Sequence, residues 1–259
     1  MHNLADLFAV ALPLPAYDVV IPCHDRAHVV ADAVESVLEQ DHAPARVIVV
    51  DDGSRDQSPA VLRSLELRHG PRVIAATLPR NGGASHARNV GAALATSPWI
   101  AFLDSDDVWL PGAARALLAA GEKADIVCGH FRRVEGDGAA GAPECGWWGD
   151  AIRSALAHGG VIGPSWSIVR RATVFAVGGF DPSFHNCNDW DFYTRAAAAG
   201  ARFRRIEAAV ALYRTVAGSR LVNDTAIGAE NARRVLAHPY LNAEGDNGLT
   251  SRCCQSDCT

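Results

Sequence analysis

The sequence lacks an apolar run of the length that crosses a membrane, which takes roughly 18 or more consecutive apolar residues. Residues 1–16 hold one apolar patch, at 7–14, but they carry Asp6 and have no basic stretch, so they do not match a signal peptide. We interpret them as a short lead-in segment. We expect no transmembrane segment and a cytoplasmic protein, and peripheral contact with a membrane stays open.

Basic residues are not in excess either, because 24 Lys and Arg face 29 Asp and Glu for a net charge of −5. This balance gives no electrostatic case for nucleic-acid binding, so we expect no nucleic-acid partner. None of the seven cysteines forms a CxxC pair, and their odd number argues against a secreted disulfide framework. Cys253, Cys254 and Cys258 lie in a C-terminal tail, 241–259, that we expect to be flexible.

The composition that remains is ordinary, with 49% apolar and 20% charged residues over 259 positions. It fits one α/β domain with a substantial core. In the first half, β-branched apolar stretches alternate with stretches of helical periodicity. The expected strands cover 17–21 (ending at Pro22), 46–50, 72–76 and 99–103, and the expected helices cover 29–38, 58–65 (with Ser58 as N-cap) and 85–95. Such alternation predicts βαβ units and a mostly parallel central sheet flanked by helices.

The second half is less regular. Strands are expected at 125–131, 165–170 and 209–215, and helices at 189–199 and 226–237. A Gly-rich loop over 136–149 carries Trp147 and Trp148, and stacking on an acceptor sugar and core packing are equally good interpretations of this pair. No linker divides the chain. We expect one domain over 17–240, with a nucleotide-binding half (17–110) and an acceptor-side half (111–240).

Three of the expected strands end in polar residues: PCHD at 22–25, DDGS at 51–54 and DSDD at 104–107. Open parallel sheets bind ligands at the carboxyl ends of their strands, so up to six carboxylates would gather on one rim. Acids after a strand also form turns and helix caps, and for one cluster alone that is the better interpretation. Three clusters in register favour a cation. Mg²⁺ or Mn²⁺, held by carboxylates and substrate phosphates, would fit at Asp104 and Asp106.

These segments resemble the family 2 glycosyltransferases of the GT-A fold. The resemblance is carried by VVIPCHD at 19–25, VIVVDDGSRD at 47–56, the stretch from RNGGASHARN to DSDD at 80–107, and NDWDFYTRAAAAG at 188–200. It implies a Rossmann-like GT-A domain and an inverting glycosyltransferase that uses a divalent metal, Mn²⁺ or Mg²⁺. The donor would be a nucleotide-diphosphate sugar, with UDP favoured. The acceptor would be a hydroxyl of a glycan, a lipid-linked molecule or a small molecule, in glycan or polysaccharide biosynthesis.

The resemblance also implies roles for single residues. The residues that would bind the nucleotide-sugar are Pro22, Asp51, Asp52, Arg88 and Asp104. Pro22 would line the base pocket through main-chain contacts, and Asp52 or its neighbour Asp51 would bond the base or ribose. Arg88 belongs to a segment, 81–89, that would close over the nucleotide.

On the metal and acceptor side, the resemblance implies Asp106 and Asp104 as metal ligands and Asp189 as the general base. Inversion needs such a base to deprotonate the acceptor hydroxyl, on the face opposite the metal-bound leaving group. Asp191 is a fallback for the base, although its preferred role is structural. Cysteine catalysis by Cys187 is rejected, because no His-paired arrangement is legible.

Two positions depart from the family pattern. Asn188 stands where members often have Glu before the base, and Val216 stands where a His often follows Tyr-Arg. The Arg of that pair, Arg214, could meet phosphate or pair with a carboxylate, and both interpretations stay open.

Two alternatives compete with the transferase. A nucleotidyltransferase would need a Gly-rich loop after the first strand, whereas this chain has PCHDRAH without glycine. A non-catalytic sugar-nucleotide-binding protein of the same fold stays open because of the two departures. Processive polysaccharide synthases carry membrane helices, so transfer of one sugar per binding event is expected.

Overall fold

The structure is a computed structural model, and it describes residues 13–136, 138–145, 147, 151–160, 162–215 and 225–243. Its first half is a parallel sheet whose strands alternate with helices. The strands are β1 (Tyr17–Cys23), β2 (Arg46–Asp51), β3 (Val73–Thr77) and β4 (Trp99–Phe102). The helices are α1 (Val30–Leu38), α2 (Ser58–His69) and α3 (Ala84–Leu94).

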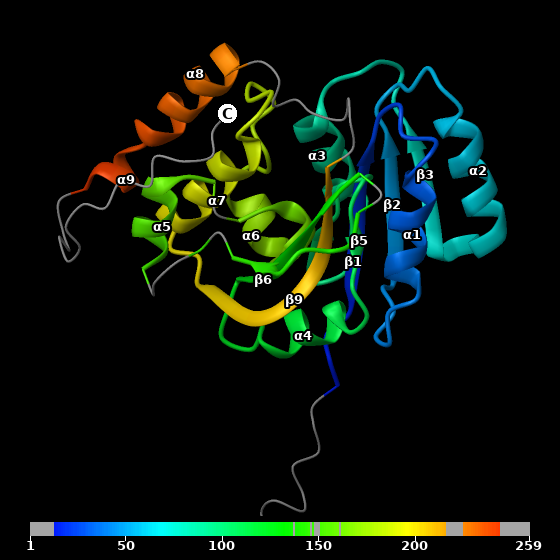
Figure 1. The fold of residues 1–259 in the computed structure, drawn as a ribbon, viewed down its shortest axis with the longest axis horizontal. Coiled ribbons are helices and arrows are strands. Elements are labelled where there is room, and N and C mark those ends of the chain that lie inside the picture. Colours follow the sequence, from blue (N-terminus) through cyan, green and yellow to red (C-terminus); the bar gives the residue numbers. More distant parts are fainter. Residues whose placement is uncertain are drawn as a thin grey trace, which may run out of the picture.

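These strands read as continuous apolar runs because both of their faces are covered, as parallel strands require. On β2, Val47 and Val49 pack with α1 and α2, whereas Ile48 and Val50 pack on the opposite face with α3. Because alternate residues of a strand face opposite sides of the sheet, β2 contributes side chains to two separate hydrophobic cores. Figure 1 shows α1 and α2 on one side of the molecule, with α3 on the other side of β1.

The second half mixes parallel and antiparallel pairs. Its strands are β5 (Val108–Trp109), β6 (Ile126–Glu135), β7 (Pro143–Glu144), β8 (Ser167–Arg170) and β9 (Phe203–Thr215). Its helices are α4 (Ala113–Ala119), α5 (Ile152–His158), α6 (Arg171–Ala176), α7 (Asn188–Ala198), α8 (Thr225–Leu236) and α9 (Pro239–Asn242). The sheet order is β3-β2-β1-β4-β8-β6-β9-β5, with β7 paired to β6. β8 runs antiparallel between β4 and β6, and so joins the two halves in one sheet.

The expected fold class is confirmed: the chain forms a single α/β domain around this sheet. All seven expected strands are present, although β9 begins at Phe203 instead of residue 209. The elements β5, β7, α4, α5 and α6 were not expected. They are two to seven residues long, which is too short for apolar periodicity to identify them.

Among the expected boundaries that were wrong, those at Pro22 and Ser58 bear on the site. β1 runs through Pro22 to Cys23. Proline has no backbone N–H, and at position 22 that group would be directed toward β4, as the backbone of Val20 is. Proline fits there because the pairing with β4 ends at Val20, so no residue of β4 loses a hydrogen bond. Ser58 is the first residue of α2 and not its cap. Its hydroxyl instead accepts the N–H of Arg26 at 2.9 Å.

Some expectations lie outside the described residues, namely those for Trp148, Val216, most of the lead-in segment and the three cysteines of the C-terminal tail. Within the residues that are described, no helix has the length and apolar character of a membrane span.

Candidate active site

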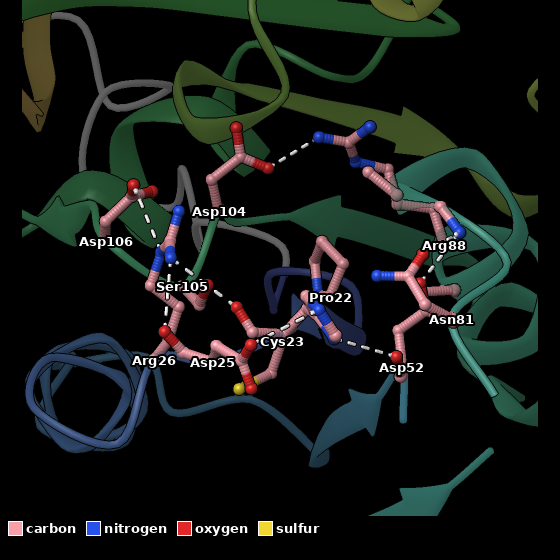
Figure 2. A pocket seen from close by; sticks show the side chains of 14 residues that line it. Pro22, Cys23, Asp25, Arg26, Asp52, Asn81, Arg88, Asp104, Ser105 and Asp106 are labelled. Carbon is pink, nitrogen blue, oxygen red and sulfur yellow. Dashed lines mark hydrogen bonds and ion pairs between the residues drawn. The ribbon is translucent and has the colours of Figure 1, made fainter. Parts of the chain in front are cut away.

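The carboxyl ends of β1, β2 and β4 lie side by side, because Cys23 is in register with Asp51 and Val20 with Phe102. The polar segments that follow these strands border a cleft of about 500 Å³. Figure 2 shows this donor cleft with its principal side chains. Five of the residues predicted from the sequence line it together, namely Pro22, Asp52, Arg88, Asp104 and Asp106.

Asp52 is fixed by two backbone amides. Its carboxylate oxygens accept the N–H groups of Gly82 at 2.9 Å and Gly83 at 2.7 Å, and the residue is buried. The segment at 80–83 therefore crosses close above β2. Gly53 makes this approach feasible, since it has φ +68° and a Cβ there would lie 2.7 Å from the carbonyl carbon of Arg80.

Asp51 faces a neighbouring hollow of about 620 Å³ instead of the donor cleft. One of its oxygens accepts the N–H of Ser54 at 3.1 Å, as in an Asx turn. The other oxygen is buried and has no hydrogen-bond partner among the described residues. Of the two acids that the sequence left open, Asp52 is thus the one in the cleft.

Arg88 connects the donor cleft to α7. From the middle of α3, its buried guanidinium donates to Asp104 Oδ1 at 2.6 Å and to Asn188 Oδ1 at 2.9 Å. It also lies over the ring of Phe180, 5.2 Å from its centre. The departure at position 188 therefore has a structural consequence: an amide oxygen satisfies Arg88 without adding a second carboxylate beside Asp104.

The acids of the DSDD segment point to different partners. Asp106 Oδ2 lies 3.7 Å from Arg26 Nε. Asp107 is buried, accepts the hydroxyl of Ser165 and receives the N–H of Arg214 at 3.0 Å. Burial and the nearby charge of Asp104 hold the pKa of Asp107 well above its usual range. Asp107 thus ties the rim to β9, and Asp104 and Asp106 are the two that line the cleft.

Asp189 lies in the first turn of α7, next to Asn188, and is not among the residues that line the cleft. It is half-buried and accepts the N–H of Trp190 at 2.8 Å. Burial raises the pKa of Asp189, and the charge of Asp104 adds to that rise while Arg88 opposes it. A carboxylate that holds its proton more strongly than usual is a better general base near neutral pH.

The other candidates on α7 have structural roles. Asp191 pairs with Arg195 at 2.7 Å, and Arg195 also donates to the carbonyl of Gly179 at 2.8 Å. This arrangement braces the turn before α7, which agrees with the preferred structural role of Asp191. Burial and the charge of Asp189 raise the pKa of Cys187 to about 11, so its thiol stays protonated.

The structure decides two open questions. Arg214 pairs with Asp32 on α1 at 2.8 Å, so the carboxylate interpretation holds in this conformation. Trp147 is buried and packs edge-on against Phe203, which places it in the core and not on an acceptor.

Two residues of the site were missed from the sequence. Arg26 lines the donor cleft, and its place directly after PCHD could have indicated a cation at the rim. Ser165 accepts the N–H of Asp104 at 3.2 Å and donates to Asp107, but no sequence pattern marks it.

Comparison with known proteins identifies the family and the fold. The family model for glycosyl transferase family 2 matches residues 18–157. The succinoglycan biosynthesis protein ExoU of Rhizobium meliloti is 30% identical over 88% of this chain and 71% of its own length. ExoO of the same organism is 38% identical over 43% of this chain and 30% of its own length. The chain thus spans only about a third of the length of some curated relatives that it matches.

Solved structures share the fold. S. aureus TarS in complex with UDP-GlcNAc superimposes with a TM-score of 0.71 at 21% identity, over 89% of this chain and 68% of that one. The mannosyltransferase PcManGT of Pyrobaculum calidifontis, in complex with GDP-Man and Mn²⁺, gives 0.65 at 19% identity, over 89% and 69%. The family match over more than half of the chain, the similarity to ExoU and the sequence motifs converge: the chain belongs to glycosyl transferase family 2.

Proposed function

We propose that this chain transfers a sugar, with inversion, from a nucleotide-diphosphate sugar to an acceptor hydroxyl. One observation carries the proposal. Asp104 and Asp106 line the donor cleft, and Arg88 donates both to Asp104 and to Asn188, the residue that precedes Asp189 on α7. Inversion requires this division, because the base and the leaving group act on opposite faces of the sugar.

The donor-binding end of the cleft is formed by Pro22 and Asp52. The carboxylate oxygens of Asp52 already accept two backbone N–H groups, and their remaining lone pairs can accept a hydrogen bond from a nucleobase N–H. Uracil carries such a donor, and a relative of the same fold is known in complex with UDP-GlcNAc. UDP-sugars are therefore the favoured donors.

A divalent cation fits Asp104 and Asp106 by the chemistry of its donor set. Both supply hard carboxylate oxygens, and the described residues contain no group of three or more His, Cys, Asp or Glu side chains arranged to hold a metal. Mg²⁺ and Mn²⁺ are commonly held by one or two carboxylates together with substrate phosphates, so two acids suffice. When bound, the metal would stabilise the growing negative charge of the departing diphosphate as a Lewis acid.

Asp189 would take the proton of the acceptor hydroxyl. Its raised pKa suits that role, and Arg88 fixes its distance from Asp104 by bonding to the preceding residue, Asn188. The names of ExoU and ExoO refer to succinoglycan biosynthesis, which favours a glycan hydroxyl as acceptor over a small molecule.

The test is nucleotide release from a panel of UDP-, GDP- and dTDP-sugars, with Mn²⁺ or with EDTA. We expect release of the nucleoside diphosphate from one donor class, dependent on metal, and a loss of about 10²-fold or more in Asp106→Ala. Glu122→Ala is the matched control, because it removes one exposed acid outside the cleft. Release of pyrophosphate would indicate a nucleotidyltransferase instead.

Nucleotide binding separates the remaining alternative. A wild-type chain that binds a sugar nucleotide with metal but releases no diphosphate, with any candidate glycan acceptor, would be a binding protein of the same fold. Failure to bind any nucleotide, even with metal, would refute the transferase.

A further inference from the structure

The donor cleft has an imbalance of charge. The carboxylates of Asp25, Asp52, Asp104 and Asp106 line it, whereas its arginines are Arg26 and Arg88. A nucleoside diphosphate brings further negative charge. Arg88 is buried and donates to Asp104 and Asn188, whereas the half-buried Arg26 lines the cleft, where its guanidinium can meet a phosphate.

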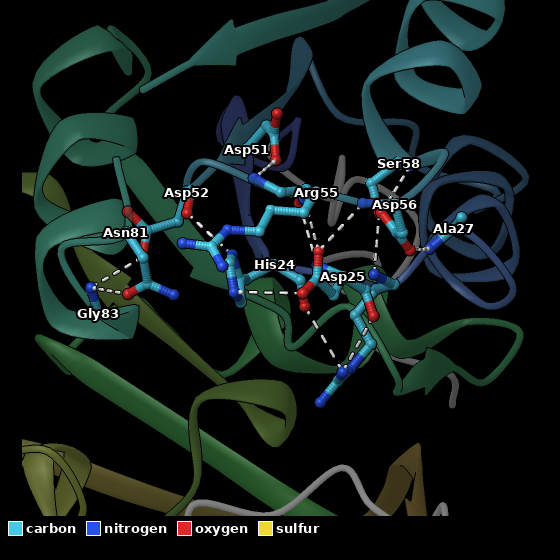
Figure 3. A network of polar contacts seen from close by, with 12 residues as sticks. His24, Asp25, Ala27, Asp51, Asp52, Arg55, Asp56, Ser58, Asn81 and Gly83 are labelled. Carbon is cyan, nitrogen blue, oxygen red and sulfur yellow. Dashed lines mark hydrogen bonds and ion pairs between the residues drawn. The ribbon is translucent and has the colours of Figure 1, made fainter. Parts of the chain in front are cut away.

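The residues on either side of Arg26, Asp25 and Ala27, are bonded to the neighbouring segment after β2, as Figure 3 shows. Asp25 has φ +52°, an uncommon value for a residue with a side chain, and such strain persists only where the surroundings enforce it. Here Asp25 Oδ1 accepts the N–H of Arg55 at 2.7 Å. Three further bonds join the loops: Asp25 N to Ser54 Oγ, Arg26 N to Ser58 Oγ and Ala27 N to Asp56 Oδ2, at 2.9–3.0 Å.

From this fixed backbone, the side chain of Arg26 reaches toward the opposite rim (Figure 2). Its Nη1 donates to the carbonyl of Asp25 at 3.1 Å, and its Nε lies 3.7 Å from Asp106 Oδ2. Charge-assisted hydrogen bonds between nitrogen and oxygen are about 2.7–2.9 Å long, so Arg26 and Asp106 attract one another without a tight bond.

We propose that Arg26 is a donor-binding residue whose guanidinium exchanges between Asp106 and the diphosphate of the nucleotide donor. Asp106 is also the proposed metal ligand, so Arg26 competes with the cation for this carboxylate. Once the cation takes Asp106, the guanidinium binds the diphosphate, for which its planar fork is well suited. The inference rests on the proposed function and adds to it a residue outside the metal site and the base.

The test uses two titrations of the full chain that need no turnover. The first measures binding of Mn²⁺ alone by electron paramagnetic resonance, and the second measures binding of UDP, GDP and dTDP at saturating Mn²⁺ by calorimetry. In Arg26→Ala we expect the two affinities to move in opposite directions. Mn²⁺ should bind about threefold or more tightly because a like charge is removed beside Asp106. The best-bound nucleoside diphosphate should bind about tenfold more weakly.

Two further variants control for folding and charge. Arg115→Ala removes an Arg–Asp pair with Asp41 that is exposed and lies outside the cleft, and it should change neither affinity. Arg26→Lys keeps the charge but loses the fork, so Mn²⁺ binding should stay at the wild-type level while diphosphate binding falls part of the way. Movement of both affinities in the same direction in Arg26→Ala, or of neither, would overturn the role of Arg26.

The outcomes also distinguish this inference from the proposed function. A chain that shows the expected opposite shifts but transfers no sugar would refute the transferase and leave the exchange intact. A chain that transfers sugar while Arg26→Ala binds Mn²⁺ and diphosphate as the wild type does would refute the exchange alone.

Discussion

The proposed donor side and the proposed acceptor side of this molecule are built differently. On the donor side, acids at strand ends are fixed by backbone N–H groups of loops beside them, as Asp52 is by Gly82 and Gly83. On the acceptor side, the key residues are fixed by side chains far away in the sequence. Asn188 is bound by Arg88, 100 positions earlier, and Arg214 binds Asp107 across 107 positions.

The difference implies that the two sides respond differently to substitution. The donor rim gets its geometry from one sheet edge, whereas the acceptor side depends on the donor half to position it. The match to the family model, which ends at residue 157, likewise covers the donor half and stops before α7. The following substitutions test whether the two sides are coupled in this way.

The largest effect is expected for Asp189→Asn. If Asp189 is the base, its loss should lower kcat by about 10²–10⁴-fold, the usual contribution of general base catalysis. Binding of the nucleoside diphosphate should stay within twofold of wild type, because Asp189 lies outside the donor lining. Turnover kinetics and calorimetry measure the two quantities. Equal losses in both would show that the sides are not separable.

The pH dependence sharpens this test. The deprotonated form of Asp189 is the active one, so kcat should rise with pH through a pKa above the ordinary 3.8 of aspartate. That acidic limb should vanish in Asp189→Asn. Asp191→Asn is the matched control, since it breaks a structural pair with Arg195 and should keep the limb.

A smaller effect, on both sides at once, is expected for Arg88→Met. The change leaves Asp104 and Asn188 without their shared donor. The free energy of unfolding should fall by about 2–3 kcal/mol. This loss is smaller than the usual cost of breaking a fully buried pair, because Asp104 is a third exposed and can be hydrated. Both donor binding and kcat should fall, the latter by about 10²-fold through misplacement.

Arg171→Met is the control for Arg88→Met. Arg171 is also partly buried, but its guanidinium donates to a backbone carbonyl, that of Ala95, outside the cleft. Comparable losses of activity in both variants would mean that a general loss of packing, and not the bridge, is responsible.

A further prediction concerns pH and stability at the donor rim. Folded Asp107 binds its proton more tightly than the unfolded chain does, so stability should fall as pH rises from about 3.8 through the raised pKa. In Asp107→Asn this fall should be reduced, since the amide oxygen can still receive the N–H of Arg214. Thermal unfolding in EDTA at a series of pH values measures this change in stability, because 1 kcal/mol shifts the melting temperature by about 2–4 °C. Identical slopes for both proteins would contradict the prediction.

The same contrast explains how far the sequence could predict the structure. The strands of the donor half were placed to within two residues, because apolar runs buried on both faces leave a continuous pattern. Their polar ends led to Asp52, Asp104 and Asp106, which the structure brings together in one cleft. The roles of these residues stay predictions.

The features that could not be predicted from the sequence depend on contacts between distant segments. The start of β9 was missed because the charged residues at 204, 205 and 207 interrupt its apolar pattern. Pairing of Phe203 with Ile126 stabilises a strand that propensity alone does not predict. Ser165 is recognisable only once the fold brings it, 58 positions along the chain, to Asp107. No periodicity or motif in the sequence predicts such a contact.

The smallest effect is expected for Arg214→Ala, which tests the link between β9 and α1. The pair with Asp32 is half-exposed, so its removal should cost less than about 1 kcal/mol of stability. The backbone N–H of Arg214 remains in the variant and should keep Asp107 in place, so donor affinity should change by less than twofold. Calorimetry with the nucleoside diphosphate decides between the two roles of this side chain. A drop of tenfold or more would mean that Arg214 leaves Asp32 to bind phosphate, and the acceptor half would then contribute directly to the donor site.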